Sequence, residues 1–300
     1  MKRTVLLLSG IMVMSCTSQQ KKLVYPETTK VDTIDVYFGT EVPDPYRWLE
    51  NDTSAATAAW VEAENKVTNA YLAQIPFREQ LLKRLTDLAN YEKIGTPFKK
   101  HGKYYFYKND GLQNQSVLYV QDSLDGEARV FLDPNQLSDD GTVALTSLSF
   151  SNDGKYTAYT ISRSGSDWSE IYVMDTATGK LLEDHINWAK FTGAAWQKDG
   201  FYYSAYDAPT KGKEFSNVNE NHKIYYHKIG TPQAEDKLIY ENPAYPKRFY
   251  SAGTSKDERI LFIYESGAGR GNNLFMKNLE KSNAPLIQLT TDFDYQYSPI

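Results

Sequence analysis

The chain has 300 residues, of which 41% are hydrophobic and 24% are charged, which is the composition of an ordinary folded protein. This length is sufficient for one large core or for two domains. Its formal net charge of −5 offers no basic surface for nucleic acid, so we expect no nucleic-acid partner. Its 23 tyrosines favour β-structure, because the ring packs on a half-buried strand while the hydroxyl stays in water.

The N-terminus has the features of a bacterial export signal. Lys2 and Arg3 form a short basic region, and residues 5–14 are an apolar run too short to span a membrane as a mature helix. The only cysteine, Cys16, follows residues similar to a lipoprotein processing site. Residues 1–22 are therefore predicted to be a signal peptide and tether, with Cys16 lipidated. The alternative is a general secretory signal with an incidental cysteine.

This signal also predicts where the protein is found. We expect an exported lipoprotein of a Gram-negative bacterium, held by a lipid anchor on the periplasmic side of a membrane.

Two prolines, Pro43 and Pro45, mark the first element after the tether. Proline has no backbone N–H and restricts the residue before it, so the sequence predicts an extended run here instead of a helix. The run would present Tyr46 and Trp48 to an apolar surface.

Two helices are predicted next. Residues 51–54 supply N-cap candidates for a helix that ends near Leu72, and Pro76 suits the first turn of a second helix over residues 77–90. The second helix has an apolar stripe made of Leu81, Leu82, Leu85 and Leu88. Two short helices have little core of their own, so they either cap the β-structure or dock on a partner domain.

From about residue 96 the pattern becomes that of β-strands. Strands rich in Tyr, Val, Ile and Thr are predicted at residues 104–108, 116–121, 128–132, 142–150, 155–161, 171–175, 201–206, 223–227, 260–264 and 274–276. Asp-Gly turns such as Asp153-Gly154 and Asp199-Gly200 let the chain reverse between antiparallel strands.

The unit at residues 150–182 recurs at a spacing of roughly 45–60 residues, which is typical of four-stranded propeller blades. The β-region therefore holds about four blades, at the low end of the roughly four to eight with which propellers close. The last residues resemble the start of another strand, so we expect an incomplete propeller.

No motif of residues 1–300 predicts a catalytic, metal or cofactor site. The segment Ser164-Gly165-Ser166-Asp167 lacks the second glycine of a nucleophile elbow and lies between two predicted strands. Residues 267–271 are glycine-rich but precede a strand, so they are a turn and no phosphate loop. The four histidines lack the spacing of a helical zinc motif and are predicted to be surface or turn residues: His101, His185, His222 and His227.

Several blocks resemble the prolyl oligopeptidase family of serine peptidases. The sequence DPYRWLE at residues 44–50 is similar to the family's N-terminal hallmark, and residues 111–119 and 121–135 are similar to its first-blade signature. The turn SGSDW at residues 164–168 and the run KFTGAAW at residues 190–196 match later blocks in the same order. The resemblance extends from about residue 25 to the end of the chain.

This resemblance implies a mainly β fold. Residues 96–300 would form part of a seven-bladed β-propeller, and residues 23–95 a short helical segment that packs on an α/β-hydrolase domain absent from residues 1–300. It also implies a serine-type endopeptidase that cleaves short peptides after proline, without a cofactor. The Ser, His and Asp of its triad would lie in the hydrolase domain, so no catalytic residue is expected here.

The resemblance further implies that the propeller is a size-excluding lid and that this segment is inactive alone. Propeller residues would help form the apolar site for the residue two before the scissile position, and block by block these are Phe191, Phe249 and Ala268. The family often has Met and Cys at the last two positions. Blade-core or loop roles are the alternative for each residue. For the whole chain, the alternative is a lipid-anchored propeller that binds a ligand without any hydrolase domain.

Overall fold

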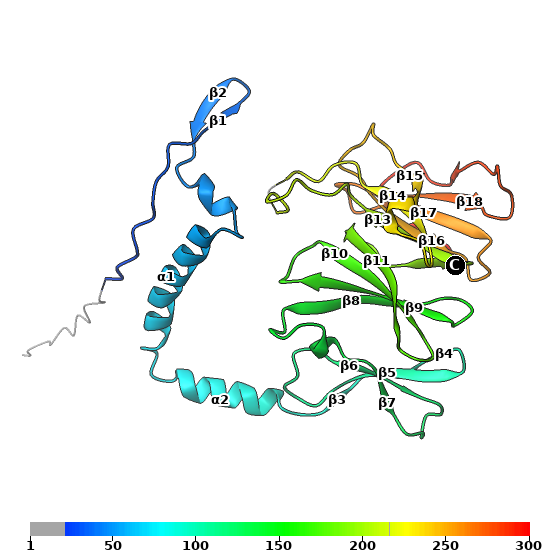
Figure 1. The fold of residues 1–300 in the computed structure, drawn as a ribbon, viewed down its shortest axis with the longest axis horizontal. Helices are drawn as coiled ribbons and strands as arrows, with labels where there is room; N and C mark the ends of the chain where they lie inside the picture. Colours follow the sequence, from blue (N-terminus) through cyan, green and yellow to red (C-terminus); the bar gives the residue numbers. More distant parts are fainter. Residues whose placement is uncertain (1–21, 216) are drawn as a thin grey trace, which may run out of the picture. The chain divides into compact units, whose positions relative to one another are not determined.

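The computed structural model describes residues 22–215 and 217–300. Contacts divide the chain into two compact units, of which the first ends at Glu79 and the second comprises Gln80–Ile300 (Figure 1). Cys16 lies outside the described residues, and its lipidation therefore stays a prediction. Within the described ranges, no helix combines the length and apolar character needed to cross a membrane.

The first unit contains a β-hairpin and a helix. Strands β1 (Ile34–Tyr37) and β2 (Thr40–Pro43) pair in antiparallel register. Helix α1 (Ala55–Leu72) begins after Ser54, whose hydroxyl accepts a hydrogen bond from the backbone N–H of Thr57 at 3.1 Å. Ser54 is thus the N-cap, within the range that the sequence predicted.

The extended run predicted after Pro43 is wrong in its second half, because Arg47–Glu50 form a 3-10 helix. The carboxylate of Asp44 accepts hydrogen bonds from the backbone N–H of Tyr46 (3.2 Å) and from Nε of Arg47 (2.8 Å). Proline restricts only itself and the residue before it, so the chain is free to turn after Pro45, and the Asp44 side chain stabilises that turn.

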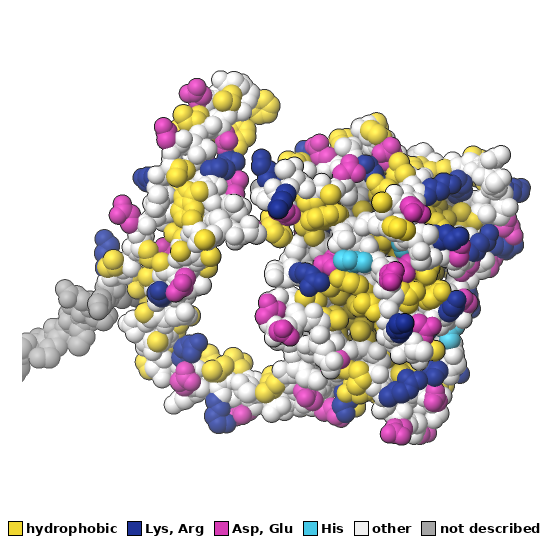
Figure 2. Space-filling model, in the orientation of Figure 1, with side chains coloured by type: hydrophobic (Ala, Val, Ile, Leu, Met, Phe, Trp, Pro, Cys, Tyr) yellow, Lys and Arg dark blue, Asp and Glu magenta, His cyan; other side chains and the backbone are white. Residues whose placement is uncertain are grey.

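The second predicted helix is confirmed as α2 (Arg78–Ala89). Its apolar stripe is exposed, with 49–55% of Leu81, Leu82, Leu85 and Leu88 accessible. Figure 2 shows hydrophobic side chains along the helical part of the chain. None of the residues of α2 is buried among the described residues, and whether the helix caps the β-structure or docks on a partner domain stays a prediction.

The second unit is a succession of antiparallel sheets, which confirms the mainly β prediction. We call its four groups of strands blades 1 to 4. Blade 1 contains β3 (Lys93–Ile94), β4 (Phe98–Lys100), β5 (Lys103–Asn109), β6 (Val117–Gln121) and β7 (Arg129–Leu132). Blade 2 contains β8 (Val143–Phe150), β9 (Tyr156–Arg163), β10 (Ser169–Asp175) and β11 (Leu181–Ala189).

Blade 3 contains β12 (Ala195–Gln197), β13 (Gly200–Ala205), β14 (Lys223–Lys228) and β15 (Lys237–Tyr240). Blade 4 contains β16 (Phe249–Thr254), β17 (Ile260–Ser266), β18 (Asn272–Asn278) and β19 (Ile287–Gln288). Blades 2 and 3 are joined into one sheet only through the pair Ala189 and Ala205. Figure 1 shows the blades following one another along the chain from cyan to red.

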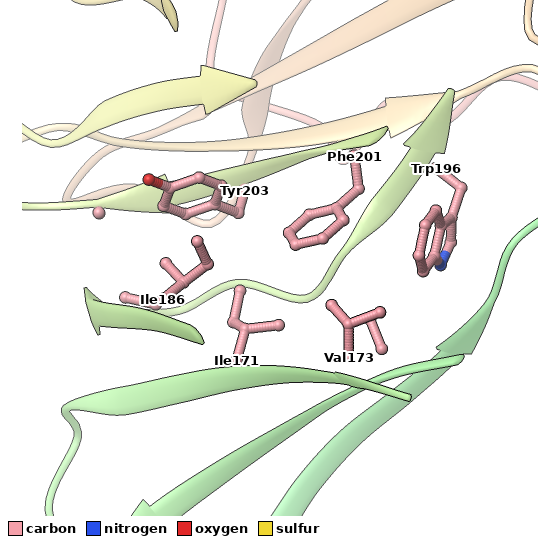
Figure 3. Close-up of a cluster of buried hydrophobic side chains, with 9 residues drawn as sticks. Ile171, Val173, Ile186, Trp196, Phe201 and Tyr203 are labelled. Carbon is pink, nitrogen blue, oxygen red and sulfur yellow. The ribbon is translucent and has the colours of Figure 1, made fainter. Parts of the chain in front are cut away.

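Apolar side chains fill the space between successive blades. Ile171, Val173 and Ile186 of blade 2 face Trp196, Phe201 and Tyr203 of blade 3, and all six are at most 5% exposed (Figure 3). Similar clusters lie between blades 1 and 2 and between blades 3 and 4. Full burial of each such side chain contributes about 1.5–3 kcal/mol, so stacking of the blades dominates the stability of this unit.

Polar bonds also join the blades at the end that carries the Asp-Gly turns. Glu258, in a turn of blade 4, accepts hydrogen bonds from Nδ2 of Asn152 (2.6 Å) and from the backbone N–H of Lys198 (2.8 Å). These two residues lie in the corresponding turns of blades 2 and 3. One carboxylate therefore holds three consecutive blades in register at this end.

The prediction that all four histidines are surface or turn residues is wrong for His222 and His227, both fully buried. Nδ1 of His227 lies 2.7 Å from Oδ1 of Asp236, and Nε2 lies 2.9 Å from Oδ1 of Asp184. Carboxylate oxygens accept, so both ring nitrogens of His227 donate and the ring is charged. Burial lowers the pKa of His227, but the hydrogen bonds and charges of Asp236 and Asp184 outweigh burial and raise the pKa.

This network makes the stability of the second unit depend on pH. A raised pKa in the folded state contributes stability that is complete below the unfolded value of about 6.5 and is lost as pH rises through the folded pKa. His227→Gln leaves two buried carboxylates without their cation and should lower the free energy of unfolding by about 3–5 kcal/mol at pH 6.

We expect the gap between the wild-type protein and His227→Gln to narrow between pH 6 and pH 9, as measured by urea unfolding of the intact protein. His101→Asn, at an exposed turn, is the control and should change neither value. A gap that stays constant across this range would contradict a charged His227.

Candidate functional site

The blades have a second end, opposite to the Asp-Gly turns, which we call the loop end. It includes the connections β9–β10 (residues 164–168), β13–β14 (residues 206–222) and β17–β18 (residues 267–271). The indole Nε1 of Trp168 donates to the carbonyl oxygen of Glu214 at 2.7 Å, which joins the first two of these connections. The predicted substrate-binding residues all lie at this end.

The structure brings two of them together. The ring centroids of Phe191 and Phe249 are 5.7 Å apart, with the ring planes inclined at 59°. Phe191 precedes β12 of blade 3, whereas Phe249 begins β16 of blade 4. Phe191 is 54% and Phe249 38% exposed, so the pair presents an apolar surface to solvent at the boundary of two blades.

Phe191 also has an unusual backbone conformation, with φ at 52°. A left-handed φ is unfavourable for a bulky residue that is not glycine, at a cost of about 1–3 kcal/mol, and it persists where surrounding contacts hold it. The ring of Phe191 is therefore placed by its neighbours and not by local preference.

The third predicted residue, Ala268, is exposed in the β17–β18 connection. Ser266, the last residue of β17, pairs with Phe249 in the ladder between β16 and β17. This register places the connection at the same end of blade 4 as Phe249. The assignment of all three residues to a substrate pocket stays a prediction.

A buried cation lies beside Phe191. Lys190 is only 7% exposed, and its Nζ lies 4.6 Å from the ring centroid of Trp168 and 5.5 Å from that of Phe191. Its nearest carboxylate oxygen, on Asp167, is 3.9 Å away. Burial lowers the pKa of Lys190, and the charge of Asp167 opposes this effect. The side chain places a positive charge at the edge of the aromatic pair, stabilised by the face of the indole.

A second cation, Arg248, directly precedes Phe249 in the chain. The guanidinium carbon of Arg248 lies 3.6 Å from the ring centroid of Tyr245 and 4.8 Å from that of Phe293. Its Nη1 donates to Oε1 of Glu265 at 3.0 Å. Glu265 is 2% exposed, whereas Arg248 is half-buried, so the carboxylate of this ion pair is the buried partner. The guanidinium of Arg248 therefore contacts two aromatic rings and one carboxylate.

Sequence reasoning named Phe191 and Phe249 but missed the roles of Lys190 and Arg248, which directly precede them. Their position directly before the two phenylalanines was the available signal in the sequence. The burial of Lys190, however, depends on Trp168 in the β9–β10 connection, which is distant in the chain. In the described part of the chain, no group of three or more His, Cys, Asp or Glu residues is placed to hold a metal ion.

Comparison with known proteins gives the family context. The family model described as "Prolyl oligopeptidase, N-terminal beta-propeller domain" matches residues 26–300. The chain is 50% identical over 274 residues to a prolyl endopeptidase of Elizabethkingia meningoseptica, which covers 91% of this chain and 38% of that relative. It is 34% identical to a dual function macrocyclase-peptidase of Galerina marginata, over 86% of this chain and 39% of that relative.

Solved structures of prolyl oligopeptidases and prolyl endopeptidases are also similar to this chain. Prolyl oligopeptidase B from Galerina marginata, bound to a 35mer hydrolysis and macrocyclization substrate, superposes with a TM-score of 0.75 at 31% identity, over 91% of this chain and 42% of that one. A structure of prolyl endopeptidases studied for inter-domain dynamics gives a TM-score of 0.62 at 35% identity, over 91% and 39%. The chain thus spans less than half the length of these relatives.

The ion pair between Arg248 and the buried Glu265 gives a testable expectation. Arg248→Met retains much of the side-chain volume but leaves the Glu265 carboxylate buried without its cation, which should cost about 3 kcal/mol of the free energy of unfolding. The double variant Arg248→Met/Glu265→Gln should be more stable than Arg248→Met alone, because it removes the unpaired charge.

Urea unfolding of the intact protein measures these differences. Arg270→Met is the matched control, since Arg270 is exposed and has no ion pair among the described residues. Equal stability of the single and double variants would show that Arg248 and Glu265 are not coupled.

Proposed function

The chain belongs to the prolyl oligopeptidase family, and from this membership we propose that it is the N-terminal part of a serine endopeptidase that cleaves short peptides after proline. The observation that carries the proposal for this segment is the exposed pair Phe191 and Phe249 at the loop end, contributed by neighbouring blades. Two relatives, at 50% and 49% identity, are named prolyl endopeptidases.

The pair supports a role in substrate binding because of its chemistry. Two inclined aromatic rings offer an apolar wall for a side chain that precedes proline in the peptide. Lys190 borders this wall with positive charge. Positive groups suit the carbonyl oxygens of a peptide backbone, so the site combines an apolar contact with polar ones, as small-molecule sites commonly do.

We propose that Ala268 completes the pocket from the β17–β18 connection. Alanine leaves more space than the larger side chains common in the family at this position. Preference for a bulky residue before proline is the expected consequence.

The catalytic step belongs to a C-terminal α/β-hydrolase domain in this proposal. There the hydroxyl of a Ser would attack the carbonyl carbon of the proline residue. A His would take the proton of that hydroxyl, and an Asp would orient the His. The propeller would cover this site as a lid, so that short peptides enter and folded proteins do not. The exposed aromatic pair at the loop end supports such a role, because it gives that end an apolar surface for a ligand.

The first unit and α2 would supply docking surface for the hydrolase domain. A groove of about 500 Å³ in the first unit is lined by apolar side chains that include Trp48, Trp60, Ala59 and Val31. The exposed leucines of α2 are a second apolar surface. Exposed apolar surface of this extent is typical of a face that another domain covers.

An anchor at the N-terminus would place the enzyme on the periplasmic side of a membrane. This part of the proposal rests on the export-type sequence around Cys16 and on no structural observation.

The proposal predicts that the full-length protein is active and that residues 1–300 alone are not. The full-length protein should hydrolyse a chromogenic peptide with proline before the reporter group, whereas residues 1–300 alone should release no product above the buffer rate. A folded substrate protein with an internal proline should resist the full-length enzyme, and its unfolded form should be cut only if it is short. Cleavage by residues 1–300 alone would contradict the assignment of the nucleophile to another domain.

The pocket makes a separate prediction, tested with two peptides that differ only in the residue before proline, Phe or Gly. In the full-length enzyme, Phe191→Ala should raise KM for the Phe peptide about tenfold, equivalent to about 1.4 kcal/mol of binding free energy. The Gly peptide should change less than about twofold, because it makes little contact with the wall. Phe191→Leu keeps an apolar wall and should be intermediate. Unchanged kinetics for the Phe peptide would remove Phe191 from the pocket.

A further inference from the structure

His222 is a buried residue that none of the proposed chemistry uses. It ends the β13–β14 connection, and its ring packs against Tyr206 with a centroid separation of 4.5 Å. Nε2 of His222 lies 3.1 Å from the carbonyl oxygen of Lys190, and Nδ1 lies 2.9 Å from the backbone nitrogen of Tyr250. One imidazole thus bridges the backbone of the segment before β12 in blade 3 and that of β16 in blade 4.

The two backbone partners determine the state of the ring. The N–H of Tyr250 can only donate, so Nδ1 accepts, and the carbonyl oxygen of Lys190 can only accept, so Nε2 carries the proton. A neutral imidazole has one donor and one acceptor, which matches this pair. Burial lowers the pKa of His222 to about 4, in agreement with a neutral ring.

The position of the two bonds links His222 to the aromatic pair. Lys190 directly precedes Phe191, and Tyr250 directly follows Phe249. Each bond therefore holds the backbone one residue away from one of the two rings. The strained φ of Phe191, 52°, needs such support.

A third bond strengthens the same link. The backbone N–H of Asn221 donates to the carbonyl oxygen of Pro246 at 2.8 Å. Asn221 and His222 together hold the segment that carries Phe249 on both sides of that residue. Directional hydrogen bonds of this kind fix the relative position of two blades more sharply than apolar contacts do.

We propose that His222 is a positioning residue for the substrate pocket: it sets the separation and inclination of Phe191 and Phe249 by bridging Lys190 and Tyr250. The inference rests on the proposed function, since it assigns a role within the proposed pocket. His222 itself does not touch the peptide. Its effect is on the selectivity for the residue before proline and not on the cleavage step.

Three substitutions of His222 test its two hydrogen bonds, to Lys190 and to Tyr250, separately. His222→Phe keeps a ring against Tyr206 but makes neither hydrogen bond. His222→Asn keeps an acceptor near the position of Nδ1, and His222→Gln keeps a donor near the position of Nε2. His101→Asn is the matched control, because His101 lies at an exposed turn in blade 1.

The test uses the full-length enzyme and the two peptides with Phe or Gly before proline. We expect His222→Phe to raise KM for the Phe peptide about tenfold, equivalent to about 1.4 kcal/mol, with kcat changed less than about twofold. The Gly peptide should keep its KM, and the Asn and Gln variants should fall between wild type and His222→Phe. The control should leave both peptides unchanged.

Other outcomes count against the inference. If the His222 variants change both peptides by the same factor, or change neither, His222 has a general structural role or none, and the positioning role is overturned. If His222→Phe does not fold, the Asn and Gln variants decide by the same comparison of the two peptides. A wild-type enzyme that cleaves neither peptide overturns the proposed function, and the inference falls with it.

Discussion

The second unit depends on one physical constraint: each sheet must cover the face of the next. Strand β9 is buried along nearly its whole length, and Ile171, Val173 and Ile186 pack on the following blade. Because the faces between successive blades are closely packed, side chains there tolerate little change in volume. The exposed aromatic pair of the proposed site accordingly lies at an end of the blades, where strands give way to turns and loops.

The aromatic pair shows what this constraint means for a binding site. Phe191 and Phe249 belong to different blades, so the space between their rings is a property of the boundary and not of either blade. Apolar packing between blades is strong but has little directional preference, and it sets the spacing of the sheets only approximately. Directional bonds such as those of His222 and Glu258 fix the register at the two ends.

The features that could be predicted from the sequence are those encoded locally. Strand periodicity, Asp-Gly turns and the N-cap at Ser54 depend on a few adjacent residues, and the structure has them close to the expected positions. The 3-10 turn after Pro45 was missed because it depends on the side chain of Asp44. Burial of His222 and Lys190 could not be read from local pattern at all, since their partners come from other blades.

His222 and His227 illustrate why residue type alone does not define a chemical role. Both are completely buried and lie five positions apart along the chain, yet the structure gives them opposite charge states. His222 meets one backbone donor and one backbone acceptor and is neutral, whereas His227 meets two carboxylates and is charged.

The neutral ring lies beside the proposed site, where one backbone donor and one backbone acceptor satisfy both of its nitrogens and no counter-charge is needed. The charged ring lies away from that site, between Asp184 at the end of blade 2 and Asp236 in blade 3, where two carboxylates compensate it. The partners that the fold supplies, and not the histidine itself, decide which of the two roles is possible.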